Sequence, residues 1–216
     1  RQMCIRDSDK GFALKVDVRR ENEVESMVKQ TVDKLGRIDI LVNSHGILMV
    51  SPLVEMSEED WDTIMDTNAK GTFLCCKHAA REMIKRKSGK IINLASILSK
   101  RASKWHAHYS ASKFAVSAIT QTLAQELAPY NIGVNEVCPG DVDTEMFKTS
   151  CRGIAKTMGM TYDEYRKMAL SHNLIGRFQY PEDVAPLVLF LASKDSDYMT
   201  GSSNDVSGGV LYPPRR

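Results

Sequence analysis

A tyrosine and a lysine lie four residues apart in the middle of the chain, at Tyr109 and Lys113. Residues at this spacing share one face of a helix, so the ammonium group can lie beside the phenol oxygen. A nearby cation favours tyrosinate and lowers the phenol pKa from its usual value of about 10. The pair therefore suggests general acid-base chemistry. Most such pairs are surface neighbours, so their context has to decide.

Short apolar strands alternate with helical patterns along the chain, and each strand ends in a loop. We predict strands over 11–18, 38–43, 90–95, 132–138 and 203–207, and helices over 24–35, 58–87, 107–128 and 181–192. We expect the second helical region to consist of two segments that meet near Asn68. This alternation predicts a single α/β domain of Rossmann type, a doubly wound parallel sheet that binds ligands beyond the carboxyl ends of its strands.

Several local signals support these boundaries. Gly36 is a suitable C-cap, Ser57 with Asp60 is a capping pair, and Pro181 suits a first helical position. Residues 143–178 have an irregular pattern rich in Met and Lys. We predict that they form a lid with one or two short helices.

Composition restricts the class of partner. The chain has 29 Lys and Arg against 27 Asp and Glu, a net charge of +2, which gives no electrostatic reason to expect a nucleic acid or a membrane surface. We expect a small molecule instead. No run approaches the roughly 18 apolar residues that span a bilayer. The cysteines lack C-x-x-C spacing and the histidines lack metal-ligand spacing, so we expect free thiols, a cytoplasmic location and no metal site.

The residues around the pair provide the context. Ser96 follows the strand predicted over 90–95 and precedes Tyr109 by thirteen residues, and the string Tyr109-Ser-Ala-Ser-Lys113 follows. This arrangement resembles the short-chain dehydrogenase/reductase family. Further segments match family motifs in order: Asn43-Ser-His-Gly46 (N-N-A-G), Asn68-Ala-Lys-Gly71 (N-x-x-G), Pro139-Gly-Asp-Val-Asp-Thr144 (P-G-x-V-x-T), and Gly201 with Asp205-Val-Ser-Gly-Gly209 near the end. The resemblance covers residues 11–211.

The resemblance implies a catalytic role for four residues. Tyr109 would be the general acid or base on the substrate oxygen, and Lys113 would tune it and bind the nicotinamide ribose. Ser96 would polarise the carbonyl group. Asn68 would extend a proton relay through water to Lys113, although a helix-junction cap is the alternative for this residue.

The resemblance also implies NAD or NADP as cofactor. The residues expected to bind it are Asp17, Val18, Asn43, Gly46, Tyr109, Lys113, Pro139, Gly140, Val142 and Thr144. Asp17 would meet the adenine edge, with helix capping as its alternative. Thr144 would hold the carboxamide or phosphate, while Pro139 and Gly140 could instead be a simple turn.

The family begins with a strand, a glycine-rich turn of the form T-G-x-x-x-G-x-G and a helix, and this sequence contains no such segment. We interpret residues 1–8 as a non-native leader and residues 9–216 as a truncated domain that lacks its first two strands. In the family's strand order these strands lie between the ones ending at Asp17 and Asn43. We therefore expect an open sheet edge, poor folding and little turnover.

The function implied by the resemblance is the interconversion of a secondary alcohol and a ketone by an NAD(P)-dependent oxidoreductase. A polyol or sugar substrate is one possibility, and a 3-oxoacyl-carrier-protein-type reductase is another. A non-catalytic nucleotide-binding scaffold is the alternative from a different class. By resemblance we also expect a homodimer or homotetramer that uses the helices predicted over 58–87 and 107–128.

Overall fold

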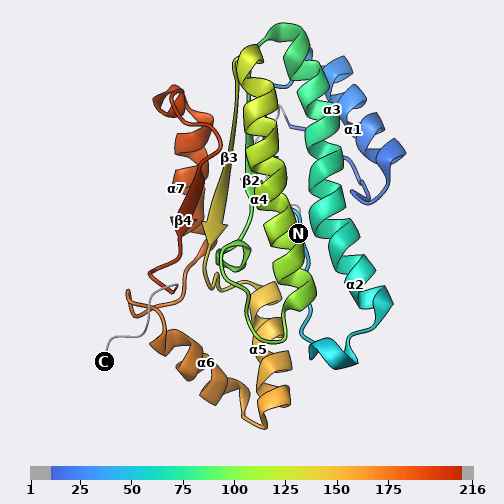
Figure 1. Cartoon of the computed structure of the whole chain (residues 1–216). Coiled ribbons are helices and arrows are strands. Elements are labelled where there is room, and N and C mark those ends of the chain that lie inside the picture. Colours follow the sequence, from blue (N-terminus) through green and yellow to red (C-terminus); the bar gives the residue numbers. More distant parts are fainter. Residues whose placement is uncertain (1–10, 211–216) are drawn as a thin grey trace.

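Four parallel strands form one sheet in the computed structural model, which describes residues 11–210. They are β1 (Ile40–Asn43), β2 (Gly89–Leu94), β3 (Ile132–Pro139) and β4 (Ser203–Val206), and they lie side by side in that order. Figure 1 labels β2, β3 and β4. Asn43 pairs with Asn93, and Asn93 pairs with Glu136, so the carboxyl ends of the first three strands lie together. The predicted leader, residues 1–8, lies outside the described residues.

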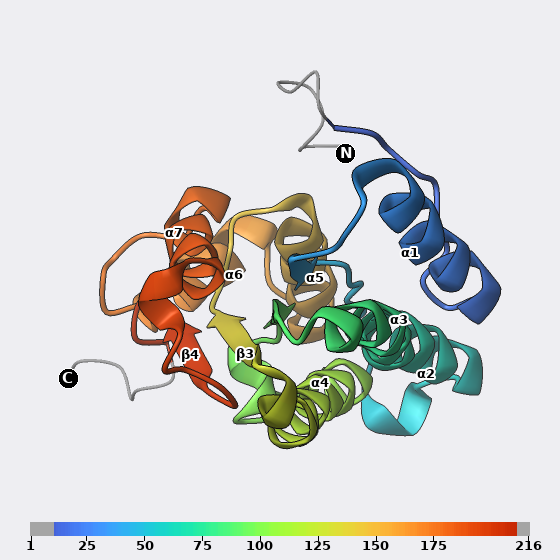
Figure 2. The ribbon, with the colours of Figure 1, turned by 90° about the horizontal axis from the view of Figure 1, so that it is seen from above.

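Helices cover both faces of the sheet (Figure 2). On one face α3 (Gly71–Arg86) and α4 (Ala107–Leu127) enclose a core with the inner side chains of β2 and β3. That core contains Cys76, Ala80, Met83, Ile91, Ala124, Leu127, Ile132 and Val134. On the other face α7 (Pro181–Ala192) buries Val184 and Leu191 against Ile92 and Val137. The predicted doubly wound α/β class is confirmed.

The capping signals that were read from the sequence are present. Gly36 ends α1 (Glu21–Leu35) in the left-handed conformation, with φ of 81°. Ser57 accepts a hydrogen bond from the Asp60 backbone at the start of α2 (Glu58–Ile64). Pro181 lies in the first turn of α7. These caps fix where the helices that border the sheet begin and end.

The predicted division near Asn68 is a turn of π-helix. The segment η2 (Met65–Lys70) joins α2 to α3 without a loop, and Asn68 is 1% exposed within it. A π-turn inserts an extra residue and redirects backbone groups, which is common at functional sites. Four short 3₁₀ turns complete the connections: η1 (Leu53–Glu55), η3 (Ile97–Ser99), η4 (Ala128–Tyr130) and η5 (Lys194–Ser196).

The predicted strand over residues 11–18 is wrong. This segment precedes a turn at Val18 and Arg19, and none of its residues is in a strand. Val16 and Val18 pack instead against Val24 of α1 and against α3. A strand requires a neighbouring backbone, and none of the described strands pairs with this segment. β1 is consequently at an edge of the described sheet.

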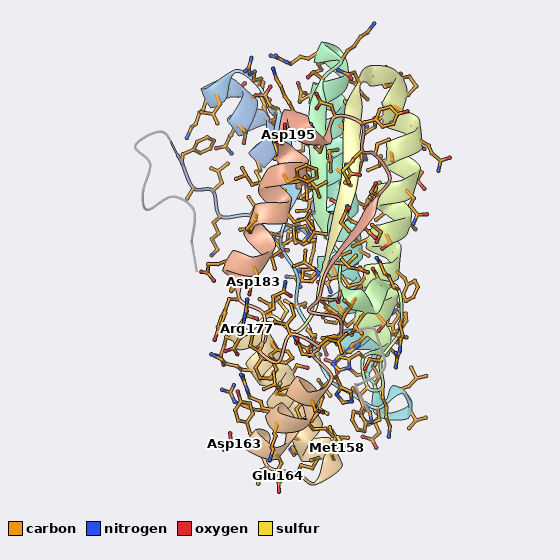
Figure 3. The ribbon with its side chains drawn as sticks, turned by 90° about the vertical axis from the view of Figure 1, so that its left-hand side faces the viewer. Met158, Asp163, Glu164, Arg177, Asp183 and Asp195 are labelled. Carbon is orange, nitrogen blue, oxygen red and sulfur yellow. The ribbon has the colours of Figure 1, made fainter. Side chains whose placement is uncertain are left out.

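The segment predicted to be a lid contains two helices, α5 (Glu145–Met158) and α6 (Tyr162–Ser171), which lie beyond the carboxyl ends of the strands (Figure 1). Arg166 of α6 donates a hydrogen bond to Asp143 at 2.8 Å, and its guanidinium lies 4.1 Å from the centre of the Phe178 ring. Figure 3 shows Met158, Asp163 and Glu164 at the end of this helix pair that is farthest from α7. These contacts attach the helix pair to the loop that follows β3.

Candidate active site

Ser96 and Tyr109 meet where β2 ends and α4 begins. Ser96 follows β2 by two residues and caps η3, because its hydroxyl oxygen accepts a hydrogen bond from the Leu98 backbone at 3.1 Å. Tyr109 is the third residue of α4, is buried, and is hydrogen-bonded to Ser96. The strand end and the helix start therefore bring both hydroxyl groups to the carboxyl edge of the sheet.

Lys113 lies one turn further along α4. Its side chain is 5% exposed, and its Nζ donates a hydrogen bond to the Leu94 carbonyl at 2.7 Å. The same Nζ is 5.8 Å from the centre of the Tyr109 ring. The last residue of β2 thus positions the ammonium group beside the tyrosine, as the helical spacing predicted.

Burial controls the protonation of both side chains. It raises the pKa of Tyr109 to about 12, while the hydrogen bond from Ser96 acts in the opposite direction. It also lowers the pKa of Lys113 to about 8. The expectation that Lys113 would lower the pKa of Tyr109 is not met, because desolvation of the phenol outweighs its hydrogen bond and the ammonium group is drawn toward Leu94.

Asn68 holds the loop after β1 against this pair. Its side-chain amide donates to the Ile47 carbonyl at 2.9 Å and accepts from the Ile47 backbone N–H at 2.8 Å. It also donates to the Ser112 hydroxyl at 3.0 Å, and Ser112 directly precedes Lys113. A Cβ atom on Gly46 would lie 3.3 Å from Asn68 Oδ1 and 3.7 Å from Lys113 Nζ, so a larger residue here would crowd the Asn68 amide.

Asn43 points away from this cluster. Its side chain donates to Asn93 Oδ1 at 2.8 Å and contacts Cys76, so its polar atoms are used within the core between sheet and helices. Asn93 in turn donates to Thr120 on α4. Only the backbone of Asn43 is therefore free to contact a ligand.

His45 adds a group to which the sequence analysis gave no role. It occupies the place of the alanine in the N-N-A-G motif, and its Nε2 is 3.4 Å from the Thr72 hydroxyl. That hydroxyl donates to the Asn68 carbonyl at 2.7 Å, so His45 Nε2 carries the proton in this contact. Burial and the nearby Lys113 cation lower the pKa of His45 to about 4.

The residues expected at the adenine end lie beside α1 and α3. Asp17 pairs with Arg19 at 2.6 Å, a contact that lowers the pKa of the carboxyl group to about 2. A Cβ atom on Gly71 would lie 2.7 Å from Val18 Cγ2, so the N-x-x-G glycine lets this segment pack on the start of α3. The structure therefore places Asp17 and Val18 near the loop after β1.

The loop after β3 forms the opposite wall. The Gly140 backbone N–H donates to the Val206 carbonyl at 3.0 Å and to Gln179 Oε1 at 3.1 Å, and Val142 pairs with Gln179. Thr144 caps α5 by accepting a hydrogen bond from the Phe147 backbone. Pro139 ends β3. This loop is thus more than a simple turn, because it joins β4, α5 and the segment before α7.

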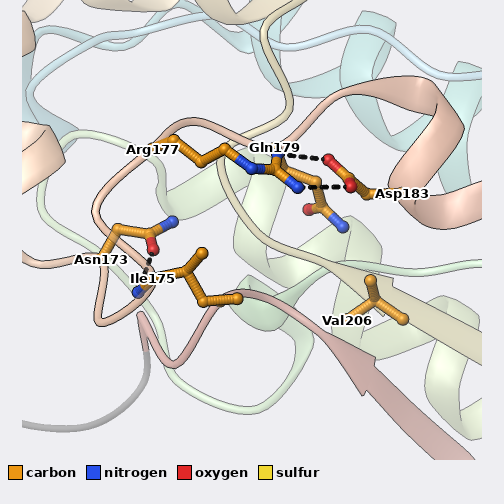
Figure 4. A pocket seen from close by; sticks show the side chains of 7 residues that line it. Asn173, Ile175, Arg177, Gln179, Asp183 and Val206 are labelled. Atoms are coloured by element: carbon orange, nitrogen blue, oxygen red, sulfur yellow. Dashed lines mark hydrogen bonds and ion pairs between the residues drawn. The ribbon is translucent and has the colours of Figure 1, made fainter.

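A pocket of about 240 Å³ lies behind this loop (Figure 4). Its lining residues are Asn173, Ile175, Arg177, Gln179, Asp183, Val206 and Gly208. Arg177 and Asp183 form a two-bond ion pair there, so the charge of each is already compensated. Ser96, Tyr109 and Lys113 do not line it, so this pocket is separate from the Ser96–Tyr109 contact.

His106 connects the start of α4 to α5. Its Nδ1 lies 2.8 Å from the Lys104 carbonyl, which can only accept, so Nδ1 carries the proton. Its Nε2 then accepts from the Ser150 hydroxyl of α5 at 3.3 Å, consistent with a pKa that burial lowers. His108 is fully buried, and neither ring nitrogen has a hydrogen-bond partner among the described residues.

The groups around Lys113 fit the nicotinamide half of a dinucleotide. An ammonium group has three donors, and the contact with Leu94 uses one of them. Gly46 has no Cβ atom to contact the Lys113 ammonium group, where such an atom would lie 3.7 Å from Nζ. Lys113, the Gly46 backbone and Thr144 are therefore suitable for ribose hydroxyls and a carboxamide.

Residues 11–210 contain no group of three or more His, Cys, Asp or Glu residues placed to hold a metal ion. None of their helices is both long enough and apolar enough to cross a membrane. Cys75, Cys76, Cys138 and Cys151 are buried free thiols.

Known proteins resemble this chain in sequence and in fold. A family model described as enoyl-(acyl carrier protein) reductase matches residues 3–211. A short-chain dehydrogenase/reductase of Armillaria gallica is 38% identical over 204 residues, covering 94% of this chain and 77% of that protein. The 3-oxoacyl-acyl-carrier-protein reductase of Thermotoga maritima is 38% identical over 196 residues, 91% of this chain and 75% of that protein.

Two further relatives act on small molecules according to their names. The (S)-acetoin-forming diacetyl reductase of Staphylococcus epidermidis is 39% identical over 213 residues, 94% of this chain and 81% of that protein. The crystal structure of sorbitol-6-phosphate 2-dehydrogenase from Erwinia amylovora superposes with a TM-score of 0.89 at 32% identity, covering 94% of this chain and 80% of that one. The chain belongs to the short-chain dehydrogenase/reductase family, a family of NAD(P)-dependent oxidoreductases.

Proposed function

We propose that this protein interconverts a secondary alcohol and a ketone, with Tyr109 as the group that moves the proton. The observation that carries the proposal is the contact between Ser96 and Tyr109 at the carboxyl end of β2, with the Lys113 ammonium one helical turn away. Two hydroxyl groups that meet at one point can bind a single carbonyl oxygen. A cation behind them stabilises negative charge that develops there.

In the direction of reduction, the substrate oxygen accepts hydrogen bonds from the hydroxyl groups of Ser96 and Tyr109. A bound nicotinamide supplies the hydride. As charge builds on the substrate oxygen, Tyr109 gives up its proton, and its high pKa keeps that proton available at neutral pH. Lys113 orients the nicotinamide ribose. Asn68 holds the loop and extends the path by which the proton is replaced.

The cofactor would follow the carboxyl edge of the sheet. In this proposal Gly46, Tyr109 and Lys113 bind the nicotinamide ribose, and Pro139, Gly140, Val142 and Thr144 bind the nicotinamide. Asp17 and Val18 lie toward the adenine, and the backbone of Asn43 lies between the adenine and the nicotinamide ends of the cofactor. The cofactor is NAD or NADP. Residues 143–178 act as the lid over the substrate, attached through Arg166 and Asp143.

A small polar substrate is the first candidate. The relatives named as diacetyl reductase and sorbitol-6-phosphate 2-dehydrogenase support it, since both names denote small oxygen-rich molecules. The second candidate is a 3-oxoacyl group on a carrier protein, supported by the Thermotoga maritima relative. A panel of diketones, polyols and 3-oxoacyl thioesters distinguishes the two by kcat/KM.

We also propose that the protein acts in the cytoplasm as a homodimer or homotetramer, with no nucleic acid or membrane partner. The helices expected at the interface expose large apolar side chains, namely Trp61 of α2, Phe73 of α3 and Phe114 of α4. Burying such side chains against a second copy would remove them from water.

The central test replaces Tyr109 by phenylalanine. Tyr109→Phe removes the proton and leaves the ring packing, so we expect kcat for ketone reduction to fall about 100-fold or more. Tyr130→Phe, at an exposed tyrosine, is the matched control and should leave kcat unchanged. Turnover is followed by the absorbance of NADH or NADPH. A Tyr109→Phe variant with full kcat would contradict the proposal, and cofactor binding without turnover across the panel would favour a non-catalytic scaffold.

A further inference from the structure

Glu136 is a carboxylate buried in the middle of the sheet. It lies on β3 and is 1% exposed. Its Oε1 accepts a hydrogen bond from the Ser117 hydroxyl at 2.9 Å and is 3.7 Å from the Cys138 thiol. Its Oε2 is buried and has no hydrogen-bond partner among the described residues. Burying a carboxylate in this way is costly unless a positive charge compensates for it.

The strand register directs this carboxylate toward the catalytic helix. Val137 faces α7, so its neighbours Glu136 and Cys138 face α4. Ser117, which holds Glu136, lies one helical turn after Lys113 on the same face of α4. Glu136 therefore faces α4 about one helical turn from Lys113, between β3 and the helix.

A chain of buried polar groups also connects Glu136 to Ser96. The Cys138 thiol is 3.7 Å from the Ser99 hydroxyl, and Ser99 donates a hydrogen bond to the Ser96 carbonyl at 2.7 Å. Two side chains, Cys138 and Ser99, thus link the carboxylate to the backbone of Ser96. Nothing in the proposed proton transfer uses it.

Within residues 11–210, Glu136 is the carboxylate that acts on the charge of Lys113. On α4 its titratable neighbour is Tyr109, on β3 they are Glu136 and Cys138, and after β1 it is His45. At neutral pH Tyr109 and Cys138 are uncharged because burial raises the pKa of each, and His45 is uncharged because burial lowers its pKa to about 4. Glu136 is the remaining group able to balance the ammonium charge.

We propose that Glu136 is a positioning residue whose buried carboxylate is the counter-ion of Lys113 and keeps that side chain charged at the end of β2. The proposal goes beyond the proposed function, and it rests on that function only for its effect on turnover. Removing the anion lowers the pKa of every titratable group near it, and we expect the largest effect at Lys113.

The first test is Glu136→Gln, which keeps the shape and the acceptor for Ser117 but removes the charge. We expect the titration midpoint of the Lys113 ammonium, followed by NMR of labelled lysine and assigned with Lys113→Arg, to fall by about one unit or more. The alkaline limb of the rate of ketone reduction should move to lower pH by a similar amount. Glu136→Asp, which keeps the charge, should restore much of the original profile.

Glu126→Gln is the matched control, because Glu126 is an exposed glutamate on the same helix. It should leave the titration of Lys113 unchanged. An unshifted Lys113 midpoint in a folded Glu136→Gln protein would overturn the inference whether or not the protein turns over substrate. A shifted midpoint in a protein without turnover would support it and count against the proposed function alone.

A double-mutant cycle tests the same pairing by stability alone, without a lysine titration and without turnover. Lys113→Met and Glu136→Gln each leave one buried charge without its partner, whereas the double variant leaves none. We expect the double variant to be more stable than the sum of the two single changes predicts. Strictly additive losses, measured by urea unfolding, would show that the two side chains do not act as a pair.

Discussion

At the scale of the residue, the sequence predicted which side chains meet but not the direction in which their protonation changes. The helical spacing of Tyr109 and Lys113 and the position of Ser96 after a strand place all three together, as the structure shows. The pKa of Tyr109 nevertheless rises. Desolvation depends on how completely segments distant in the chain cover the phenol, and no local spacing encodes that coverage.

The hydrogen-bond partners of Lys113 and Asn68 could not be predicted from the sequence. The Leu94 carbonyl, the Ser112 hydroxyl and the Ile47 backbone hold Lys113 and Asn68. Each contact joins elements that are distant in the chain. One signal was visible: Glu136 is a charged residue within a strand that is otherwise buried, and such a residue requires a partner.

His45 should make the fold sensitive to acid. Its pKa is about 4 when folded and about 6.5 when unfolded, so the unfolded chain binds more protons between these values. Stability contributed by the neutral imidazole is present above pH 6.5 and is lost as pH falls toward 4. We expect His45→Asn to reduce this loss by about 1–3 kcal/mol, measured by urea unfolding at several pH values. Parallel curves for variant and parent would show that His45 is not the group responsible.

At the scale of the element, helix and strand positions were predictable because amphipathic spacing and caps are local. The structure confirms helices near 24–35, 107–128 and 181–192 to within a few residues. It places a π-turn where the sequence suggested a junction. The type of that turn depends on the Asn68 amide meeting the Ile47 backbone, which is a long-range contact.

We expect position 140 to require glycine, because the chain after β4 passes close to the end of β3. A Cβ atom there would lie 2.9 Å from the Ser207 carbonyl oxygen and 3.0 Å from Ser207 Cα, both backbone atoms that cannot move cheaply. We expect Gly140→Ala to lower the free energy of unfolding by about 1–3 kcal/mol.

Gly133→Ala, on the same strand, is the matched control for Gly140→Ala. Its Cβ atom would meet nothing closer than the Met199 carbonyl oxygen at 3.5 Å, so we expect a change within about 1 kcal/mol. Thermal or urea unfolding measures both. Equal effects of the two substitutions would contradict the role of the close contact at Gly140.

At the scale of the whole molecule, the order of strands decides which surfaces are exposed. The described sheet has β1 at one edge, and the segment expected to be a further strand packs on helices α1 and α3 instead. Its sequence has the apolar character of a strand, but pairing requires a partner that local pattern does not supply. Ile40 and Val42, two residues apart on β1, are 46% and 40% exposed.

This edge should make the 216-residue chain self-associate beyond the proposed dimer or tetramer. Unpaired backbone groups beside exposed apolar side chains are a template for strand addition by another copy. Replacing Ile40 and Val42 with threonine keeps β-branching but removes apolar surface, so we expect sedimentation velocity to show fewer large species as concentration rises.

Val54→Thr is the matched control for the edge variant, since Val54 is 93% exposed in η1 and belongs to no strand. If it reduces association as much as the double substitution does, general surface hydrophobicity is the cause and the edge is not. If only the edge variant stays monodisperse, it also becomes the background in which to measure turnover. In that background, a loss of activity in Tyr109→Phe can be distinguished from a loss of soluble protein. In a chain that associates through its sheet, the two effects would look the same.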